Sequence, residues 1–407
     1  MLAVFTVSVG YGVVLPLLPS LVQRLQATAD AAALVSRHTG LLTATYALAL
    51  FLAAPAWGRL SDAYGRRNVL VTGMLGFSAA TAVFSAVGSI GGVYVQRFLS
   101  GIFAAAAVPV GAATIGDLAQ AAEQRGRRLA FLSMAGIAGF LIGPTLGVFV
   151  SRVGTETLGL GAQPGSITIP LASMAVLGAF VSVVVAVAVP NNPGAPGPRE
   201  PRPTGPPPAA TRAIVRLLAL TFIVSSAIGV FEVGLALRGT QELLLTPYQI
   251  ALMFTECSLV MFAAQAAVFS PWIKPEATSR FITPALTVLL VGLLFVPWAS
   301  DFVLMLTVVG GVAAGAGVAS PIFTYWISTK AGPAQGWQLG KQTAAASLGM
   351  TAGSAAGGLL FNVGGVSGVS FLLTAGLVAV GLVVASDLRS ILAAGLTDPD
   401  RGGRKQS

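Results

Sequence analysis

Charged side chains are scarce in this chain of 407 residues. Asp, Glu, Lys and Arg together make up 9% of it, whereas hydrophobic residues make up 55% and the mean hydropathy is +0.83. A soluble domain carries about 25% charged residues, and a globule of this length cannot cover itself with so few. The composition excludes a soluble protein and predicts a polytopic protein of the lipid bilayer.

Cysteine and histidine are almost missing as well. With one cysteine, Cys257, the chain has no internal disulfide, and we interpret this residue as a small buried hydrophobe. The one histidine, His38, falls in a predicted loop, so we expect neither a histidine-based metal site nor a catalytic triad. The sequence also holds no phosphate-binding loop and no Cys–His zinc pattern. We therefore expect no cofactor, no metal and no ATP-driven pumping by this chain alone.

Long apolar runs, by contrast, fill most of the chain. Twelve segments are long enough to cross about 30 Å of hydrocarbon. They run approximately over residues 2–22, 39–58, 69–88, 92–116, 129–150, 168–189, 213–237, 248–270, 282–299, 302–327, 342–362 and 367–386.

The sixth and seventh segments are separated by residues 190–212, which include nine prolines and are typical of an extended polar linker. The sequence therefore predicts an all-α integral membrane fold of two six-helix bundles. We place the bundles at 1–189 and 213–388, the linker at 190–212 in the cytoplasm, and a cytoplasmic tail at 389–407.

Basic residues set the predicted orientation. The net charge of +9 would suggest a nucleic-acid partner in a soluble chain, but here the positive-inside rule explains it, and we expect no nucleic acid. With the linker inside, 18 basic residues lie on the cytoplasmic side and four on the other, namely Arg24, Arg37, Arg152 and Arg238. We predict a monomer in the plasma (inner) membrane with both termini in the cytoplasm.

The two halves of the chain resemble each other. Phe5–Val13 and Phe222–Val230 share the pattern F-x-V-S-x3-G-V at an offset of 217 residues. Trp57 and Trp272, each followed by a loop, match at an offset of 215. Two glycine-spaced segments, the fifth and the eleventh, also correspond. Duplicated halves around a central site are typical of secondary transporters.

The densest charge cluster of the first half lies between the second and third segments. Gly58, Asp62, Gly65, Arg66 and Arg67 form the pattern G-x3-D-x2-G-R-R. This pattern resembles a signature of the major facilitator superfamily, and the resemblance extends over the whole chain.

Three further patterns resemble motifs of the twelve-helix drug:proton antiporters of that superfamily. They are the span-1 motif at Gly10, Pro16 and Pro19, the span-4 motif at Arg97 and Gly101, and the span-5 motif at Gly136, Gly139, Gly143, Pro144 and Gly147. The chain departs from the family at two places. Val148 replaces a glycine in span 5, and Gly358 replaces a proline in span 11.

The resemblance implies the major facilitator fold and a proton-coupled exporter that moves small, amphipathic compounds by alternating access, as in multidrug efflux. The alternative within transporters is an importer or facilitator of a sugar-like or other organic metabolite, against which the Gly-Pro motif of span 5 argues. A membrane enzyme or receptor is the different-class alternative. The sequence offers it only isolated acids and no sizeable soluble domain.

The span-5 glycines follow one another at spacings of 3, 4 and 4, which places them on one face of a helix. Such a face permits close helix approach, and Pro144 bends the span. We expect this face to close the two halves against leakage while they rock, with ordinary small-residue packing as the alternative. Gly349, Gly353 and Gly357 form a similar face in span 11.

Glu232 and Glu256 are the most deeply placed acids, about 8 Å and about 12 Å below the outer ends of their spans at 1.5 Å per residue. Desolvation at such depth favours the protonated form, so both are proton-coupling candidates. The alternatives are pairing with a base such as Arg238, or exposure to outer water. Arg97 is a third candidate through the family motif, with snorkelling to the outer headgroups as its alternative.

Asp117 ends span 4 on the predicted cytoplasmic side. The resemblance implies that it pairs with an arginine of the Gly58–Arg67 stretch in the outward-facing state, so that Gly58, Asp62, Gly65, Arg66, Arg67 and Asp117 form a conformational latch. Asp62 is also a candidate to cap the start of span 11 near Lys341, where the helix dipole favours an anion.

Five larger side chains are candidates for lining a substrate cavity, with ordinary packing as the alternative for each. They are Tyr11, Tyr46, Met134, Phe231 and Tyr325.

Overall fold

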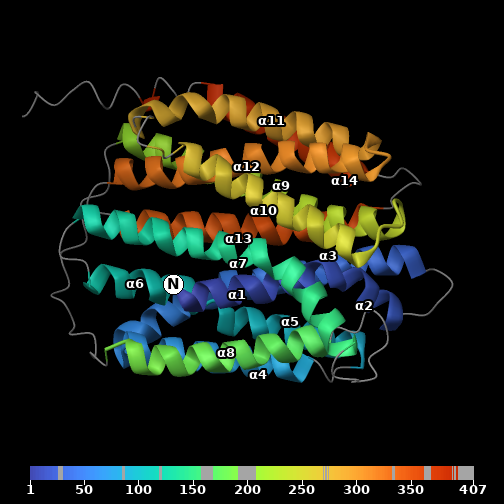
Figure 1. Ribbon diagram of the computed structural model, residues 1–407. Helices are drawn as coiled ribbons and strands as arrows, with labels where there is room; N and C mark the ends of the chain where they lie inside the picture. Colours follow the sequence, from blue (N-terminus) through green and yellow to red (C-terminus); the bar gives the residue numbers. More distant parts are fainter. Residues whose placement is uncertain are drawn as a thin grey trace, which may run out of the picture.

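A computed structural model of the protein describes residues 1–25, 31–84, 88–118, 122–156, 168–190, 208–268, 270, 273, 275–331, 335–361, 368–386, 388 and 391–392. Within these ranges the chain forms α-helices, short 3₁₀ helices and turns, and no strand. The predicted all-α fold is confirmed. Figure 1 shows the helices side by side and nearly parallel.

The first half of the chain contains eight α-helices and one 3₁₀ helix. They are α1 (Leu2–Val14), η1 (Leu15–Leu17), α2 (Leu18–Leu25), α3 (Ala31–Tyr64), α4 (Arg66–Phe84), α5 (Ile90–Ala104), α6 (Ala107–Leu118), α7 (Ala122–Glu156) and α8 (Thr168–Ala188).

The second half repeats the arrangement with six α-helices and two 3₁₀ helices. They are α9 (Pro208–Gln241), α10 (Pro247–Val268), η2 (Pro275–Phe281), α11 (Ile282–Phe295), η3 (Val296–Trp298), α12 (Phe302–Ala331), α13 (Gln335–Leu359) and α14 (Val369–Ser386).

Eleven stretches of the described chain are helical, long and apolar enough to cross a membrane, judged by length and composition. The predicted segment that is missing from this set is the eleventh, at 342–362, which corresponds to α13. Its hydropathy is low because Gly, Ala, Ser, Thr and Gln take the places of larger apolar residues. Since α13 packs extensively against both α9 and α3, it needs little lipid-compatible surface.

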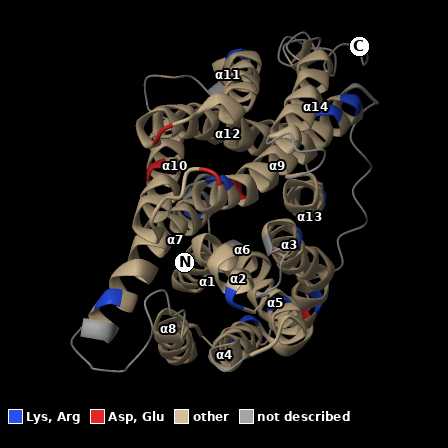
Figure 2. Ribbon diagram, turned by 90° about the vertical axis from the view of Figure 1, so that its right-hand side faces the viewer, with Lys and Arg blue, Asp and Glu red and all other residues tan. Residues whose placement is uncertain are grey.

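Contacts divide the helices into two groups. We call α1–α8 the N-bundle and α9–α14 the C-bundle, because each set packs mainly within itself. The two largest contacts between the bundles are α3 with α13 and α7 with α10, and smaller ones join α9 to η1, α2 and α3 and α10 to η1. Figure 2, which looks along the helices, shows the C-bundle above the N-bundle with these two pairs at their junction.

Helix α3 defines the two ends of the molecule, which we call the Ser36 end and the Asp62 end. At the Ser36 end, the Ser36 hydroxyl donates to Gln241 Oε1 at 3.3 Å, and Gln241 Nε2 donates to the Ala32 carbonyl at 3.2 Å. Nearby, a Cβ added to Gly40 would lie 2.5 Å from the Gly358 Cα. The bundles are therefore in close contact at the Ser36 end. Only a residue without a side chain fits at Gly358, where the family has proline.

Two predicted boundaries were wrong. Helix α9 begins at Pro208, inside the predicted linker, whose residues 191–207 lie outside the described part. Helix α3 begins at Ala31, eight residues before the predicted span, so His38 lies in a helix rather than a loop. There its Nδ1 is 3.0 Å from the Tyr94 hydroxyl on α5, a contact within the N-bundle.

The internal duplication is visible in the packing of α1 on α7 and of α9 on α13. A Cβ on Gly139 would collide with the Phe5 carbonyl oxygen, and a Cβ on Gly349 would collide with the Phe222 carbonyl oxygen. Phe222 follows Phe5 by 217 residues and Gly349 follows Gly139 by 210. The same close approach of two helices therefore occurs once in each bundle.

Candidate functional site

The middle of α9 is buried on every side, since each residue from 230 to 239 is shielded from the surface. This stretch holds an acid, Glu232, which is 7% exposed. The Tyr11 hydroxyl of α1 donates a hydrogen bond of 2.8 Å to Glu232 Oε2. Because α1 belongs to the N-bundle and α9 to the C-bundle, this bond joins the two bundles in their interior. A hydrogen bond to a charged group contributes about 1.5–3 kcal/mol.

The Tyr11 ring belongs to a chain of aromatic contacts. The Tyr11 ring stacks on Tyr46 of α3 with centroids 5.2 Å apart, and it lies 5.8 Å from Phe140 of α7. Phe140 in turn meets Phe254 of α10 edge to face at 6.3 Å. The ring that carries the donor hydroxyl is therefore part of a chain of four rings from both bundles. The Glu232 carboxylate itself is buried, and there a charge is costly and a proton or cation is favoured.

Arg97 lies behind the same ring stack. Its side chain is 4% exposed, and its guanidinium carbon is 5.8 Å from the Tyr46 ring centroid and 5.7 Å from that of Phe84. Its Nε has no hydrogen-bond partner in the part of the chain that the structure describes. Arg97 is thus held by cation–π contacts inside the N-bundle. The alternative of snorkelling to the headgroups is excluded.

The other charged residue in the buried stretch of α9 is Arg238. Its Nη1 bonds to Glu242 Oε2, and its Nη2 donates to the carbonyls of Pro297 at 2.8 Å and Ala299 at 2.9 Å. Arg238 is therefore not the partner of Glu232, which removes one of the alternatives for that acid. Partial burial raises the pKa of the Glu242 carboxyl, and Arg238 opposes that rise.

Glu256 lies in a different environment from Glu232. It is half-buried in α10, and its Oε2 is buried without a hydrogen-bond partner among the described residues. Its Oε1 would be 3.1 Å from a Cβ placed on Gly310 of α12. No hydrogen bond or ion pair of the described residues joins Glu256 to the Tyr11–Glu232 pair, although both acids lie close enough to the buried Cys257 thiol to act on it electrostatically.

The predicted charged loop is mostly helix. Helix α3 continues to Tyr64, and only Gly65, with φ of +86°, separates it from α4. The expected loop from Gly58 to Arg67 is thus a one-residue break, which a left-handed glycine permits. The prediction missed this because the segment is polar, yet polar residues are stable in a helix that leaves the bilayer.

Asp62 and Arg66 face each other across this break. Arg66 Nη1 bonds to Asp62 Oδ1 and donates to the Ser61 hydroxyl at 2.6 Å, while Asp62 stays 67% exposed. Arg67 is half-buried. The side chain of Asp117 lies outside the described residues, so its predicted pairing with this segment stays a prediction.

The glycine face of α7 contradicts one expectation. We expected it to close the two halves, but it packs on α1 within the N-bundle. A Cβ on Gly143 would lie 2.7 Å from the Val9 carbonyl, and one on Gly147 would lie 3.0 Å from Val13 Cγ1. Gly136 lies against Val4 at 3.4 Å. The glycine face therefore packs α7 closely against α1 within the N-bundle.

Pro144 and the span-11 glycines also pack two helices of one bundle against each other. Pro144 lies within α7, where its Cδ would be 3.1 Å from a Cβ on Gly12 of α1. In the C-bundle, a Cβ on Gly353 would collide with the Ser226 carbonyl of α9, and one on Gly357 would lie 3.1 Å from the Val230 Cα.

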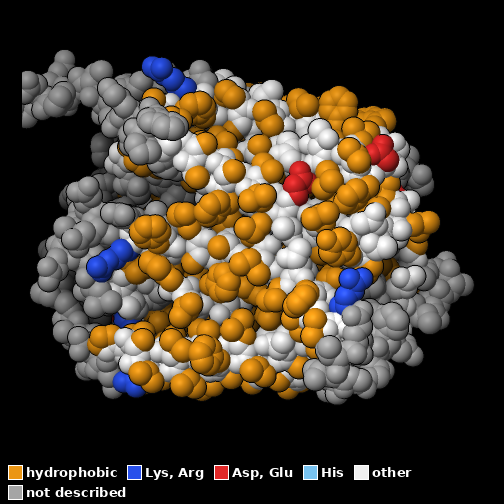
Figure 3. Space-filling view, viewed as in Figure 1, with side chains coloured by type: hydrophobic (Ala, Val, Ile, Leu, Met, Phe, Trp, Pro, Cys, Tyr) orange, Lys and Arg blue, Asp and Glu red, His pale blue; other side chains and the backbone are white. Residues whose placement is uncertain are grey.

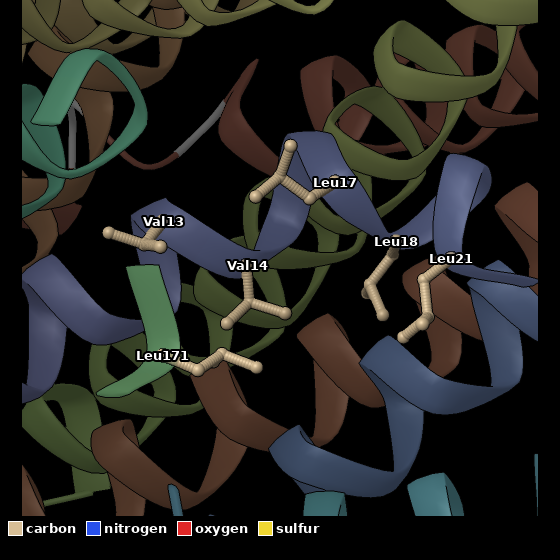
Figure 4. Close-up of a pocket in the computed structure, with 6 residues that line it drawn as sticks. All are labelled: Val13, Val14, Leu17, Leu18, Leu21 and Leu171. Atoms are coloured by element: carbon tan, nitrogen blue, oxygen red, sulfur yellow. The ribbon is translucent and has the colours of Figure 1, made fainter. Parts of the chain in front are cut away.

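The span-1 motif marks an interruption between α1 and α2. Pro16 is in η1, and Pro19 is buried in the first turn of α2. A Cβ on Gly10 would lie 2.8 Å from the Phe77 ring. Beside this interruption is a shallow crevice with aliphatic walls that is too small to hold a water molecule; Figure 4 shows its lining residues, Val13, Val14, Leu17, Leu18, Leu21 and Leu171. None of the predicted cavity residues lines it, and ligand sites of drug-sized molecules are about 300–1,000 Å³.

The five predicted cavity residues lie in different surroundings. Tyr11 and Tyr46 belong to the ring stack beside Glu232. Phe231 is 2% exposed in the hydrophobic core, so it was wrong as a lining residue. Tyr325 packs edge to face on Trp326, with centroids 5.6 Å apart, and Met134 is half-buried on α7.

Sequence reasoning missed the residues that bring the bundles together. Gln241, Ser36 and Gly40 make the contacts at the Ser36 end, and Phe140 and Phe254 complete the ring stack. The Gly358 departure from the family pattern was the one available signal. A glycine in place of a proline indicates close approach of another backbone.

Comparison with known proteins gives three kinds of likeness. The model of the Major Facilitator Superfamily matches residues 1–336. The chain is 24% identical over 360 residues to multidrug resistance protein 2 of Bacillus subtilis (strain 168), covering 88% of this chain and 87% of that protein. It is 24% identical over 362 residues to quinolone resistance protein NorA of Staphylococcus aureus (strain COL), covering 88% of each.

Solved structures show the same fold. The human organic anion transporter MFSD10 (TETRAN) matches with a TM-score of 0.69 and 19% identity, over 94% of this chain and 97% of that chain. An auto-inhibited peptide transporter of the POT family matches with a TM-score of 0.73 and 12% identity, over 100% of this chain and 98% of that chain. At these identities the likeness concerns the fold alone.

Proposed function

The chain belongs to the Major Facilitator Superfamily, and from that premise we propose that it exports small, amphipathic compounds in exchange for protons by alternating access. It is a multi-pass membrane transporter of small molecules rather than an enzyme. The direction and the class of cargo rest on relatives named for multidrug and quinolone resistance. The span-5 pattern, which resembles that of antiporters, supports export over import.

The observation that carries the proposal is the hydrogen bond from Tyr11 to Glu232. It joins α1 to α9 across the two bundles, and its acceptor is an acid shielded from water. When Glu232 is ionised, the bond is charge-assisted and strong; when Glu232 is protonated, the charge is lost and the bond weakens. Protonation of one side chain therefore changes how firmly the bundles are held together, which is what coupling requires.

Arg97 has a supporting role in this proposal. Its guanidinium lies over the Tyr46 ring, and the same ring stacks on Tyr11. Its positive charge acts on the hydroxyl of Tyr11, the donor to Glu232, and we propose that it strengthens this hydrogen bond when Glu232 is ionised. Of the three coupling candidates, the arrangement favours Glu232 as the proton carrier and Arg97 as its electrostatic support.

The two ends of the molecule then take different roles. We assign the Asp62 end to the cytoplasm of the cell and both termini with it, because the excess of basic residues lies there. The close contacts of Gln241 and Gly358 make the described state one that is closed on the outer side. In the opposite state, we propose that the latch of Gly58, Asp62, Gly65, Arg66, Arg67 and Asp117 holds the cytoplasmic side closed against α13.

Purified protein in proteoliposomes tests the proposal. With an imposed proton gradient, we expect the wild type to drive transport of ethidium, a fluorescent amphipathic cation, and a protonophore to abolish it. Glu232→Gln keeps the shape of the side chain but cannot release a proton, so gradient-driven transport is expected to stop. Glu232→Asp, which keeps an ionisable group, is the matched control and retains part of the rate. Gradient-driven transport by the Glu232→Gln variant would refute Glu232 as the carrier.

A further inference from the structure

Glu256 lies on the exposed face of α10. Residues Leu252, Glu256, Leu259 and Ala263 follow one another at spacings of three or four, so they share one side of the helix. Leu259 is 54% exposed, and Ala263 is exposed as well. Residues on other sides of α10, such as Phe254 and the adjacent Cys257, are buried in the core. An acid therefore shares its helix face with side chains that meet lipid.

The neighbouring helix α12 has a gap opposite this acid. A Cβ added to Gly310 would lie 3.1 Å from Glu256 Oε1 and near no other described atom outside its own helix. A Cβ added to Gly311 would meet nothing within 4 Å. One and two turns earlier on the same side, Thr307 is exposed and Val303 is 70% exposed. The carboxylate thus occupies the space over Gly310, and the next residue, Gly311, leaves open space on the adjoining side of α12; we call these two glycines the Gly310 notch (Gly310 and Gly311).

The surface around the notch is apolar. Helices α10, α12 and α11 lie one above another toward the viewer in Figure 1, and Figure 3 shows the face that they form. Orange apolar side chains cover most of it, with an isolated acidic side chain near its middle. Within the spans of these three helices, Glu256 is the sole Asp or Glu of the sequence. An outer face of this composition in a membrane protein lies against lipid.

An unpaired carboxylate in this position is costly. Glu256 lies about 13.5 Å along α10 from its start at 1.5 Å per residue, well inside the hydrocarbon layer. Its Oε2 is buried without a hydrogen-bond partner, and it forms no ion pair among the described residues. Arg238, the base in the buried stretch of α9, is engaged elsewhere, since it bonds to Glu242 and to backbone carbonyls. An acid in the membrane that lacks a protein partner calls for a partner from outside the protein.

We propose that Glu256 and the Gly310 notch form a membrane-facing site for amphipathic monocations that arrive from within the bilayer. The carboxylate neutralises the single charge, the notch admits the charged group, and the apolar faces of α10 and α12 take the rest of the molecule. This inference rests on the proposed function and names its substrate class. It separates cation capture at Glu256 from proton exchange at Glu232, a site on the interior of the same bundle.

Binding of radiolabelled tetraphenylphosphonium to the protein in phosphatidylcholine nanodiscs tests the site without any gradient. Tetraphenylborate, which has nearly the same shape and the opposite charge, is the ligand control. We expect saturable binding of the cation and none of the anion. Glu256→Gln is expected to weaken cation binding at least about tenfold. Gly311→Leu, which fills the notch and leaves the carboxylate in place, is expected to weaken it by a similar factor.

A matched control for the leucine is Gly376→Leu in α14. Gly376 is also exposed, and an added Cβ there meets nothing within 4 Å, but it lies outside this face. Gly376→Leu is expected to bind the cation like the wild type. Equal weakening by Gly311→Leu and Gly376→Leu would overturn the site. So would unchanged binding in Glu256→Gln, or equal binding of cation and anion by the wild type.

The Glu232→Gln variant distinguishes this inference from the function on which it rests. We expect it to bind tetraphenylphosphonium within about threefold of the wild type while it loses gradient-driven transport. If Glu232→Gln alone abolished binding and Glu256→Gln did not, cation capture would belong to the interior site and the inference would fail. If Glu232→Gln kept gradient-driven transport, the proposed coupling would fail, whatever the binding result.

Discussion

Glu232 and Glu256 are 24 residues apart in sequence and belong to the same bundle, yet their surroundings are opposite. Glu232 is 7% exposed and accepts a hydrogen bond from Tyr11 of the other bundle, whose ring stacks on Tyr46. Glu256 is half-buried on an apolar outer face beside Gly310, and its Oε2 has no hydrogen-bond partner in the described part of the chain. Depth along the helix, which is similar for both, does not determine what an acid in a membrane does.

The difference between the two acids indicates that the role of an acid in the membrane depends on whether it has a hydrogen-bond partner within the protein. An acid whose hydrogen bond joins two moving parts converts its own protonation into a change of their contact. An acid that lacks such a bond is available to a ligand. We therefore expect variants to divide into those that disturb coupling and those that disturb capture.

The largest effect is expected from the single variant Glu232→Gln, which is compared with the single variant Glu256→Gln. Glu232→Gln should lower gradient-driven ethidium transport to the level of empty proteoliposomes, because no proton is carried. Glu256→Gln should raise the KM for the cation and keep the response to the gradient at saturating substrate. The measurement is transport rate against substrate concentration, with and without a gradient. Loss of gradient response in both variants would erase the distinction between the two acids.

A smaller effect is expected from Tyr11→Phe, which removes the hydroxyl and keeps the ring stack. The lost hydrogen bond to a charged acceptor corresponds to about 1.5–3 kcal/mol, so we expect transport to fall at least about tenfold. Tyr46→Phe is the matched control, because the Tyr46 hydroxyl makes no hydrogen bond in the described part of the chain although its ring lies in the same stack. Equal rates in Tyr11→Phe and wild type would show that the bond between bundles is not used.

Asp62→Asn is expected to slow transport by about fivefold and to leave cation binding unchanged. Asp62 is exposed near the end of α3 and pairs with Arg66; an exposed ion pair contributes about 0–1 kcal/mol, which limits the size of the effect. Transport rate and nanodisc binding are measured on the same preparation, with monodispersity as the check of folding. Normal turnover would return this segment to a role in membrane orientation alone.

The smallest effect is expected from Gly310→Ala. The added Cβ would lie 3.1 Å from Glu256 Oε1, so the carboxylate has to move by a few tenths of an ångström. We expect tetraphenylphosphonium binding to weaken about threefold, or about 0.6 kcal/mol, with the gradient response intact. Gly311→Ala, whose Cβ meets nothing, should bind closer to wild type. The reverse order of the two variants would place the cation elsewhere.

The fold was largely predictable because lipid imposes simple constraints on sequence. Apolar length and basic-residue asymmetry identified the spans, and the repeated F-x-V-S-x3-G-V pattern indicated the duplication. The eleventh span was the hardest, since α13 is packed between α3 and α9 and carries few residues suited to lipid. High hydropathy indicates contact with lipid, so a membrane helix that is enclosed by other helices is not detected by its hydropathy.

The site was less predictable, because sequence shows how deep a residue lies and not which way it points. Phe231 and Glu232 are adjacent, yet one is core packing and the other receives a bond from α1. Arg238 seemed a partner for the deep acids, and it bonds instead to Glu242, one turn further on. The span-5 glycines formed one face as predicted, but the helix against that face, α1, follows from the tertiary fold.

Proton release on substrate binding tests the central claim most directly. Purified protein in weakly buffered detergent is mixed with saturating tetraphenylphosphonium, and a pH-sensitive dye reports the protons set free. We expect release from the wild type and from Glu256→Gln at a correspondingly higher cation concentration, and none from Glu232→Gln. If Glu232→Gln released as many protons as the wild type, the bond between Tyr11 and Glu232 would not be the proton-coupled link between the bundles.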